Sequence, residues 1–128
     1  DETGKVIEVL AEYDPATRGG NTPDGRKVKG TIHWVDDRTA ISAEVRLYSS
    51  LFSDPEPEAG DKDFLACLNP DSLEVLTDCR LEASLANAEA PAAYQFLRMG
   101  YFCVDNTDST PEHLVFNRAV SLKDSFKK

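Results

Sequence analysis

The stretch Ile41–Tyr48 reads ISAEVRLY, in which Ile, Ala, Val and Leu alternate with Ser, Glu, Arg and Tyr. Successive side chains of a β-strand point to opposite faces, so this alternation predicts a strand with one face buried and the other exposed. The fold class then depends on how often the same period recurs along the chain.

A period of two recurs on both sides of this segment. The candidate strands are residues 5–13, 29–35, 41–48, 73–75, 94–97, 101–105 and 114–122. Loops rich in glycine or proline interrupt them at 19–25 and 54–60. Short helices are expected near 63–68, capped by Asp61 or Asp63, and near 84–88. This spacing is typical of an all-β barrel or sandwich.

The charge is unevenly distributed. The 128 residues carry a net charge of −9 and 41% hydrophobic side chains. Such acidity argues against non-specific coating of nucleic acid and against binding to an anionic membrane. Residues 36–90 hold 13 acidic and 4 basic side chains, whereas 17–34 and the segment from 91 onward are net basic. Both flanks can therefore still face an anion.

Cysteine and histidine residues are present, but they do not occur at the spacings that mark a catalytic or metal site. The cysteines, Cys67, Cys79 and Cys103, contain no CxxC pair, and His33 and His113 lack ligand-like spacing. No nucleophile-elbow, zinc-protease, P-loop or dinucleotide motif occurs. We expect free thiols, a cytoplasmic location, no membrane contact, and no catalytic or metal-binding residues. A start without Met or signal peptide suggests a fragment of a longer protein.

The segment 94–102 reads YQFLRMGYF and combines aromatic rings with Gln95 and Arg98. Gln and Arg make directed hydrogen bonds to base edges, and aromatic rings stack on unpaired RNA bases. A turn or bulge at Met99 and Gly100 would bring Gln95 and Arg98 to one edge. The alternative is that the rings, Tyr101 included, are core and the polar pair is a solvated rim.

Five segments resemble bacterial glutaminyl-tRNA synthetases, in family order and at family-like spacing. They are DGRKVKGTIHWV at 24–35, EVRLY with LF at 44–52, NPDSL at 69–73, QFLR with GYFC at 95–103, and VFNR at 115–118. The resemblance covers nearly the whole chain, from about Tyr13 to Phe126.

The resemblance implies a fold and a parent enzyme. Residues 1–128 would be a single C-terminal anticodon-binding domain, an antiparallel β-barrel of the ribosomal-protein-like kind with one or two short helices. The parent would join glutamine to its tRNA through glutaminyl-adenylate, with ATP and Mg in a catalytic domain that this segment lacks. The fragment itself would be non-catalytic and without a cofactor.

The resemblance also implies site residues. In the family, the Gln and Arg of a QFxR motif hydrogen-bond the middle anticodon base, a uridine, and here these are Gln95 and Arg98. Position x is usually charged and is Leu97 here, which is not expected to disturb reading. Ser125 matches a hydroxyl residue close to the anticodon.

Further cations are candidates for contacts with phosphates or with a neighbouring barrel, although a solvated strand entry remains an equal reading for 26–29. They are Arg26, Lys27, Lys29, Lys123, Lys127 and Lys128. Readers of the first and third anticodon bases would lie upstream of residue 1. The expected partners are the tRNA(Gln) anticodon loop and the parent's upstream barrel and catalytic domain, with no DNA. The alternative function is an acidic β-barrel module that binds protein without RNA.

Overall fold

The chain divides into two units, Asp1–Thr31 and Ile32–Lys128, and each is described by itself. A computed structural model describes residues 1–18, 22–28, 30 and 32–122. The described part of the first unit has one short helix, η1 (Pro15–Thr17), capped by the Asp14 carboxylate, which accepts from the Ala16 N–H at 3.1 Å. The second unit contains the sheet.

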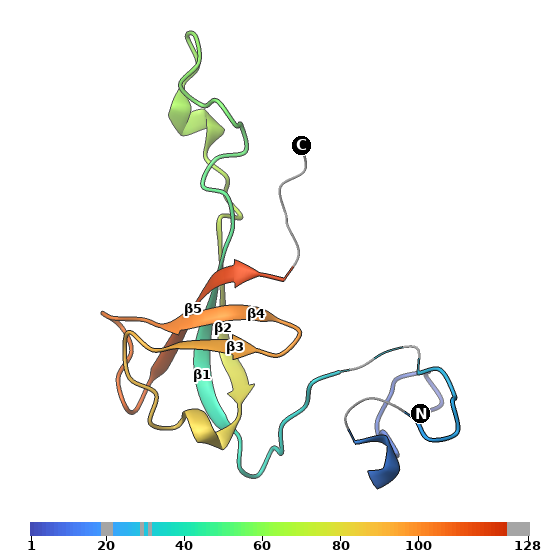
Figure 1. Cartoon of the computed structure of the whole chain (residues 1–128). Helices are drawn as coiled ribbons and strands as arrows, with labels where there is room; N and C mark the ends of the chain where they lie inside the picture. Colours follow the sequence, from blue (N-terminus) through green and yellow to red (C-terminus); the bar gives the residue numbers. More distant parts are fainter. Residues whose placement is uncertain (19–21, 29, 31, 123–128) are drawn as a thin grey trace. The chain divides into compact units, whose positions relative to one another are not determined.

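The sheet of the second unit has five strands in the order β2-β1-β5-β4-β3 (Figure 1). The strands are β1 (Ile41–Tyr48), β2 (Leu73–Leu81), β3 (Ala93–Phe96), β4 (Gly100–Val104) and β5 (Leu114–Ser121). Two single-turn 3-10 helices, η2 (Phe64–Cys67) and η3 (Ala83–Leu85), precede β2 and follow it. The all-β prediction is confirmed, and each of the five strands contains or overlaps a predicted one.

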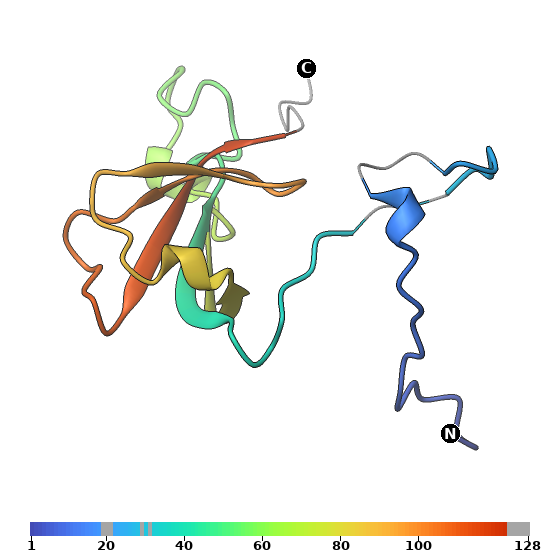
Figure 2. The same ribbon diagram turned by 60° about the horizontal axis from the view of Figure 1, so that its bottom comes forward.

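The strand pairing gives the sheet its shape. β1–β2, β3–β4 and β4–β5 are antiparallel, whereas β1 and β5 run parallel. Among the described residues the sheet differs from a fully antiparallel, closed barrel in two ways: β1 and β5 run parallel, and the end strands β2 and β3 do not pair with each other. Figure 2 shows β3 and β4 crossing over the other strands, as expected of a strongly twisted sheet.

The core lies on the face of the sheet where the apolar residues of these strands meet. Ala43 and Val45 of β1 are only 4% and 5% exposed, which matches the predicted alternation. Phe116 of β5 is fully buried and contacts the rings of Tyr94 and Phe96, with centroid distances of 6.1 and 5.4 Å. The core therefore fixes edge strand β3 mainly through aromatic contacts.

The polar side of β1 is held by a charged network. The Arg46 guanidinium donates to Glu44 at 2.7 Å and to Asp108 at 2.6 Å. Asp105 accepts from the Asp108 and Thr107 N–H groups and from the Asn117 side chain. The Asp108 N–H first, then Asn117 and the Thr107 N–H, lower the pKa of Asp105 to about 2. The network thus ties the loop before β5 to the middle of β1.

Two predicted strands are wrong within the described residues. Residues 5–13 form no strand, and Val6, Ile7, Val9 and Leu10 are 74–87% exposed. Residues 30 and 32–35 also form none, and Ile32 and Trp34, expected to face inward, are 82% and 74% exposed. Alternation produces a strand only where a neighbouring strand supplies hydrogen-bond partners, and neither segment is paired in the described structure.

The connection between β1 and β2, residues 49–72, extends from the end of the sheet as an arm (Figure 1). Asp63 caps η2 by accepting from the Leu65 N–H at 3.0 Å, one of the two expected caps. A Lys62–Asp54 ion pair of 2.6 Å closes the loop at the end of the arm. Several acidic residues of the middle segment therefore lie on this arm, away from β3–β5.

Several findings on the described residues bear on function. None of their helices has the length and apolar character needed to cross a bilayer. Cys67, Cys79 and Cys103 are free thiols. The described residues contain no group of three His, Cys, Asp or Glu side chains arranged to hold a metal ion.

Candidate nucleic-acid interface

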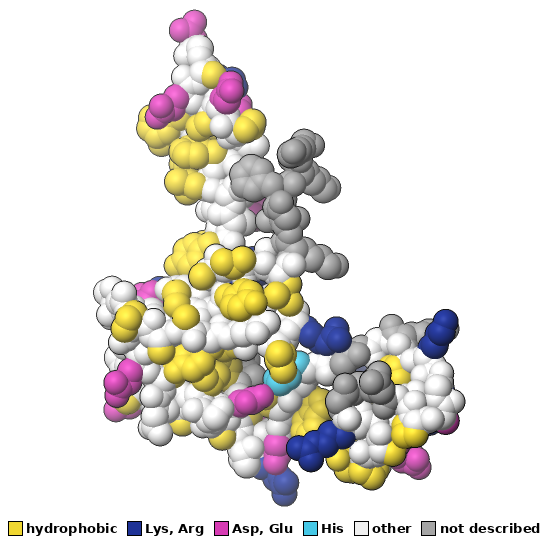
Figure 3. Space-filling view, in the orientation of Figure 1, with side chains coloured by type: hydrophobic (Ala, Val, Ile, Leu, Met, Phe, Trp, Pro, Cys, Tyr) yellow, Lys and Arg dark blue, Asp and Glu magenta, His cyan; other side chains and the backbone are white. Residues whose placement is uncertain are grey.

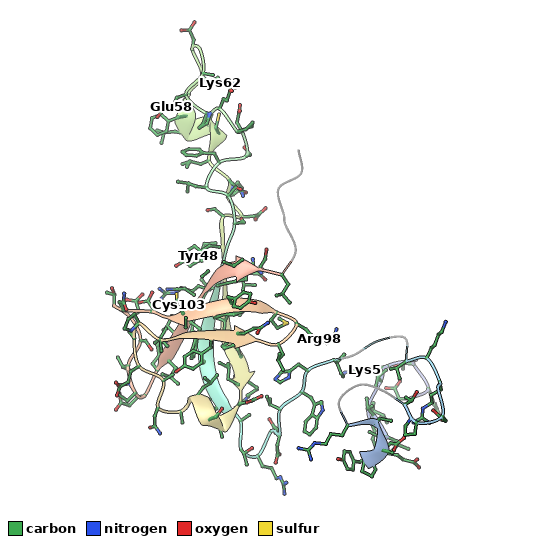
Figure 4. All side chains as sticks on the ribbon, in the orientation of Figure 1. Lys5, Tyr48, Glu58, Lys62, Arg98 and Cys103 are labelled. Carbon is green, nitrogen blue, oxygen red and sulfur yellow. The ribbon has the colours of Figure 1, made fainter. Side chains whose placement is uncertain are left out.

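The candidate site is the hairpin formed by β3 and β4. Its turn is closed by the Met99 N–H, which donates to the Phe96 carbonyl at 2.9 Å. Arg98 is the third residue of this turn, is exposed, and has a φ of 66°. Figure 4 shows Arg98 at the end of the hairpin. A positive φ at the third position is the mark of a type II turn, where glycine or asparagine is preferred.

The backbone at Arg98 is therefore strained. A left-handed conformation costs a side-chain-bearing residue roughly 1–2 kcal/mol, because its Cβ crowds the following carbonyl oxygen. Arg98 is the single non-glycine residue with positive φ among those described. Such strain is commonly retained where the side chain has a task that glycine cannot perform, so the conformation points to a function for the guanidinium.

Replacement of Arg98 by glycine and by alanine tests this strain directly. Both changes remove the guanidinium, but only glycine accepts the positive φ without cost. We expect the free energy of unfolding of Arg98→Gly to exceed that of Arg98→Ala by about 1 kcal/mol. In regular secondary structure the order is reversed, because alanine is there more stabilising than glycine. Urea unfolding of the two variants measures the difference. If alanine is the more stable variant, Arg98 is not held in a strained turn.

The strand before the turn separates its side chains by face. Tyr94 and Phe96 are half-buried and pack on the core, whereas Gln95 between them is exposed. Gln95 pairs directly with Tyr101 of β4, and directly paired residues share a face. β3 ends at Phe96, so Arg98 belongs to the turn and does not continue the face of Tyr94 and Phe96. One hairpin thus carries both predicted readers.

The strands around these residues lack acidic side chains. Residues 91–104 and 114–122 contain no Asp or Glu, although the whole chain has 23 of them. Arg98 and Arg118 are the cations of these two segments. Among the space-filled atoms of Figure 3, hydrophobic side chains are exposed over the sheet. Strands without carboxylates repel phosphates less than the charge of the whole chain would suggest.

A cavity of about 460 Å³ lies on the core side of the hairpin. Apolar side chains of β1, β2, β3 and β4 line most of it, among them Leu47, Leu76 and Phe96. His33, which lies 3.5 Å from Glu82, and Gln95 also border it. Gln95 therefore stands at the edge between an apolar cavity and the outer face of the sheet.

The remaining predicted contact residues belong to other segments of the chain. Arg26 lies in the first unit, where it forms ion pairs with Asp14 at 2.6 Å and Asp24 at 3.6 Å. Lys27 belongs to the same unit and is exposed. The predicted contacts of Lys29 and Ser125 lie outside the described residues, as do Lys123, Lys127 and Lys128.

Comparison with known proteins identifies the type of domain. Residues 31–105 match the family model described as the anticodon-binding domain of class I tRNA synthetases for E and Q. The chain belongs to this family. The matched residues include β1 to β4, Gln95 and Arg98. This match favours RNA binding over an acidic module that binds only protein.

Relatives with curated names agree with the family. The chain is 50% identical over 128 residues to the glutamine–tRNA ligase of Bradyrhizobium diazoefficiens and 52% identical over 128 residues to that of Vibrio parahaemolyticus. It is 53% identical over 125 residues to the enzyme of Nitrobacter winogradskyi. All or nearly all of this chain aligns, but it spans only 22–23% of the length of these relatives.

Sequence reasoning missed one residue of this surface. It grouped Tyr101 with the core aromatic residues, yet the ring is 46% exposed on the face of Gln95. The available signal was the hairpin register: with the turn placed at 96–99, Gln95 faces Tyr101. The turn was expected at Met99 and Gly100, whereas the observed turn spans 96–99, so the pairing of Gln95 with Tyr101 was not predicted.

Proposed function

We propose that this chain is the C-terminal anticodon-binding part of a glutamine–tRNA ligase and that Gln95 and Arg98 recognise the middle anticodon base of tRNA(Gln). The observation that carries the proposal is their placement on one exposed, acid-free hairpin within the region that matches the anticodon-binding family. Arg98 supports it further, because its strained backbone has no evident structural purpose.

The chemistry of the two side chains suits a uridine. The Watson–Crick edge of uracil offers two carbonyl acceptors and one N–H donor. The Gln95 amide carries both donors and an acceptor, and the Arg98 guanidinium carries only donors. Together they complement a uracil edge, whereas a cytosine would place its amino group opposite a donor. A base in an anticodon loop is unpaired, so this edge is accessible.

The parent enzyme in this proposal supplies everything that the chain lacks. An upstream catalytic domain binds ATP and Mg and forms the glutaminyl-adenylate, and an upstream barrel reads the other anticodon bases. Residues 1–128 would act as one C-terminal domain against those parts, in the cytoplasm, without DNA or membrane contact. Cations such as Arg26 and Lys27 would contact phosphates or the neighbouring barrel.

Alanine variants in the full-length enzyme test the two readers. Gln95→Ala and Arg98→Ala should each lower kcat/KM for tRNA(Gln) by about 5- to 150-fold, which corresponds to the roughly 1–3 kcal/mol of one directed base contact. ATP–pyrophosphate exchange without tRNA should change little, because the adenylate forms elsewhere. Steady-state charging and exchange assays give the two values.

The matched control is Arg38→Ala, which removes one exposed cation of the same unit away from the hairpin. It should leave tRNA kinetics unchanged. If Gln95→Ala and Arg98→Ala behave like Arg38→Ala, neither residue reads the anticodon.

A further inference from the structure

The outer face of the hairpin holds an aromatic ring that contacts no other ring among the described residues. Tyr101 of β4 is 46% exposed, between Gln95 of β3 on one side and Val120 of β5 on the other. We propose that the Tyr101 ring is the stacking platform for the base whose edge Gln95 and Arg98 recognise. This inference rests on the proposed function and adds a residue to it.

The sheet register places the ring and the amide at the right separation. Directly opposed residues of an antiparallel pair have Cβ atoms about 4.5–5.5 Å apart, on the same face. A base stacked on the Tyr101 ring would therefore have its edge within reach of the Gln95 amide. The turn that holds Arg98 begins at Phe96, the residue after Gln95, so the guanidinium can approach the same edge from the hairpin end.

A local irregularity lies beside Tyr101. The register between β4 and β5 shifts between Tyr101 and Phe102, with Ala119 of β5 as the extra residue. Such a bulge increases the local twist of the sheet, and bulges are frequent beside functional sites. Phe102 is 2% exposed in the core, whereas its neighbour Tyr101 is directed outward.

The other aromatic rings of the hairpin are already occupied. Phe96 stacks on Phe102 with a centroid distance of 4.3 Å and contacts Phe116, and Tyr94 contacts Phe116 edge-on. Among the described residues, Tyr101 makes no ring contact of this kind. The rings of Phe96 and Phe102 beside the apolar cavity are therefore already stacked on each other, whereas the exposed Tyr101 ring can accept a base.

The proposed ring and the two polar side chains make different contributions to binding. Stacking is tolerant of sequence because every base has a π-face, so Tyr101 would supply affinity, and the hydrogen bonds of Gln95 and Arg98 would supply identity. Val120, which lies opposite Tyr101 on β5 and is 57% exposed, would cover part of the rest of the base. No acidic residue of β3, β4 or β5 opposes the sugar–phosphate backbone.

A protein–RNA double-mutant cycle in the full-length enzyme tests the platform. The RNA is the anticodon stem–loop of tRNA(Gln), either intact or with an abasic nucleotide at the middle anticodon position. The variants are Tyr101→Leu, Tyr101→Thr and Tyr101→Phe. The matched control is Tyr48→Leu at the end of β1, where the tyrosine is also 46% exposed. Fluorescence anisotropy gives Kd for each pair.

We expect Tyr101→Leu and Tyr101→Thr to weaken binding of the intact loop by about 5- to 150-fold, the range of one lost base stack. The abasic loop should bind these two variants and the wild type with similar Kd, because the base and the ring act on each other. Tyr101→Phe and Tyr48→Leu should leave Kd unchanged. Circular dichroism of each variant verifies the fold. The difference in Kd between the intact and the abasic loop on the wild-type protein measures the contribution of the base without any protein variant.

Two failures are distinguishable. If the Tyr101 variants keep wild-type affinity and the full abasic penalty, while Gln95→Ala loses preference for the middle uridine, the platform is wrong and the proposed function stands. If wild-type protein binds the loop with any middle base equally well, the proposed function fails and the platform fails with it.

Discussion

Replacement of Phe116 by alanine is expected to lower the free energy of unfolding of the chain by about 3–5 kcal/mol, the cost of truncating a buried phenylalanine. Phe116 is 0% exposed and lies at the centre of the core cluster. It contacts the rings of Tyr94 and Phe96 at centroid distances of 6.1 and 5.4 Å. Urea unfolding followed by circular dichroism measures the change.

The same change should reach the candidate site. β3 is an edge strand of four residues, and β4 is its one neighbour among the described strands, so its position depends on the two rings that rest on Phe116. Gln95 lies between these rings in sequence, and loosening them lets the amide move. Phe116→Ala in the full-length enzyme should therefore weaken tRNA binding, although Phe116 is buried and cannot touch RNA.

Two variants separate this effect from a general loss of phenylalanine. Phe64→Ala, in the arm, removes a ring that is 48% exposed and should change the free energy of unfolding far less. Phe116→Leu preserves most of the volume and should restore much of the stability and of the tRNA binding. A Phe116→Ala variant as stable as Phe64→Ala would mean that the core is not built around this ring.

The strands that could be predicted are those that pair within the described sheet. β1 and β5 have clear apolar runs, and each pairs with two strands of the same sheet. The pattern at 5–13 is equally clear, yet its apolar side chains are exposed and it pairs with none of the described strands. Local alternation reports a strand's preference for a pleated, half-buried surface and carries no information on whether that surface is present.

The candidate site was predictable in its residue types and less so in its geometry. Gln95 and Arg98 follow from the QFLR pattern, but a strand read through Leu97 places Arg98 on the face of Phe96. The structure ends the strand at Phe96 and places Arg98 in a turn at a φ of 66°. No propensity favours arginine there, and sequence-based reasoning fails most readily at such locally unfavourable, functional positions.

The parallel pairing of β1 with β5 could not be predicted from the alternation of apolar and polar residues. Val45 lies opposite Phe116 although 71 positions separate them in the numbering, and every contact between these strands is of this non-local kind. Periodicity reports which face of each strand is buried, and leaves strand order and direction open. The core that supports Gln95 therefore follows from topology, which only the structure provides.

Gly100→Ala is expected to lower the free energy of unfolding by about 2–6 kcal/mol, because it combines backbone strain with overpacking, each about 1–3 kcal/mol. Gly100 has a φ of 146°, a region that side-chain-bearing residues rarely adopt. A Cβ there would lie 2.5 Å from the Val120 carbonyl oxygen, which belongs to the backbone of β5 and cannot swing aside. Urea unfolding of the variant gives the value.

Gly60→Ala isolates the part of this cost that comes from the close approach. Gly60, in the arm, also has a positive φ, of 68°, but a Cβ there would meet nothing within 4 Å. It should therefore cost only the roughly 1–2 kcal/mol of a left-handed residue. Equal losses for the two variants would show that β4 and β5 separate freely at this point.

The effect of Gly100→Ala on tRNA binding tests whether the glycine is needed for the candidate site as well as for stability. Gly100 pairs with Phe96 across the hairpin and with Ser121 of β5, so it joins the turn of Arg98 to the centre of the sheet. An alanine would push β4 away from β5 and shift Tyr101, the next residue, which lies beside the β5 bulge. Gly100→Ala should therefore weaken tRNA binding even under conditions where the variant remains folded, whereas Gly60→Ala should not. The close approach of the two backbones at Gly100 thus sets the position of the exposed ring beside Gln95.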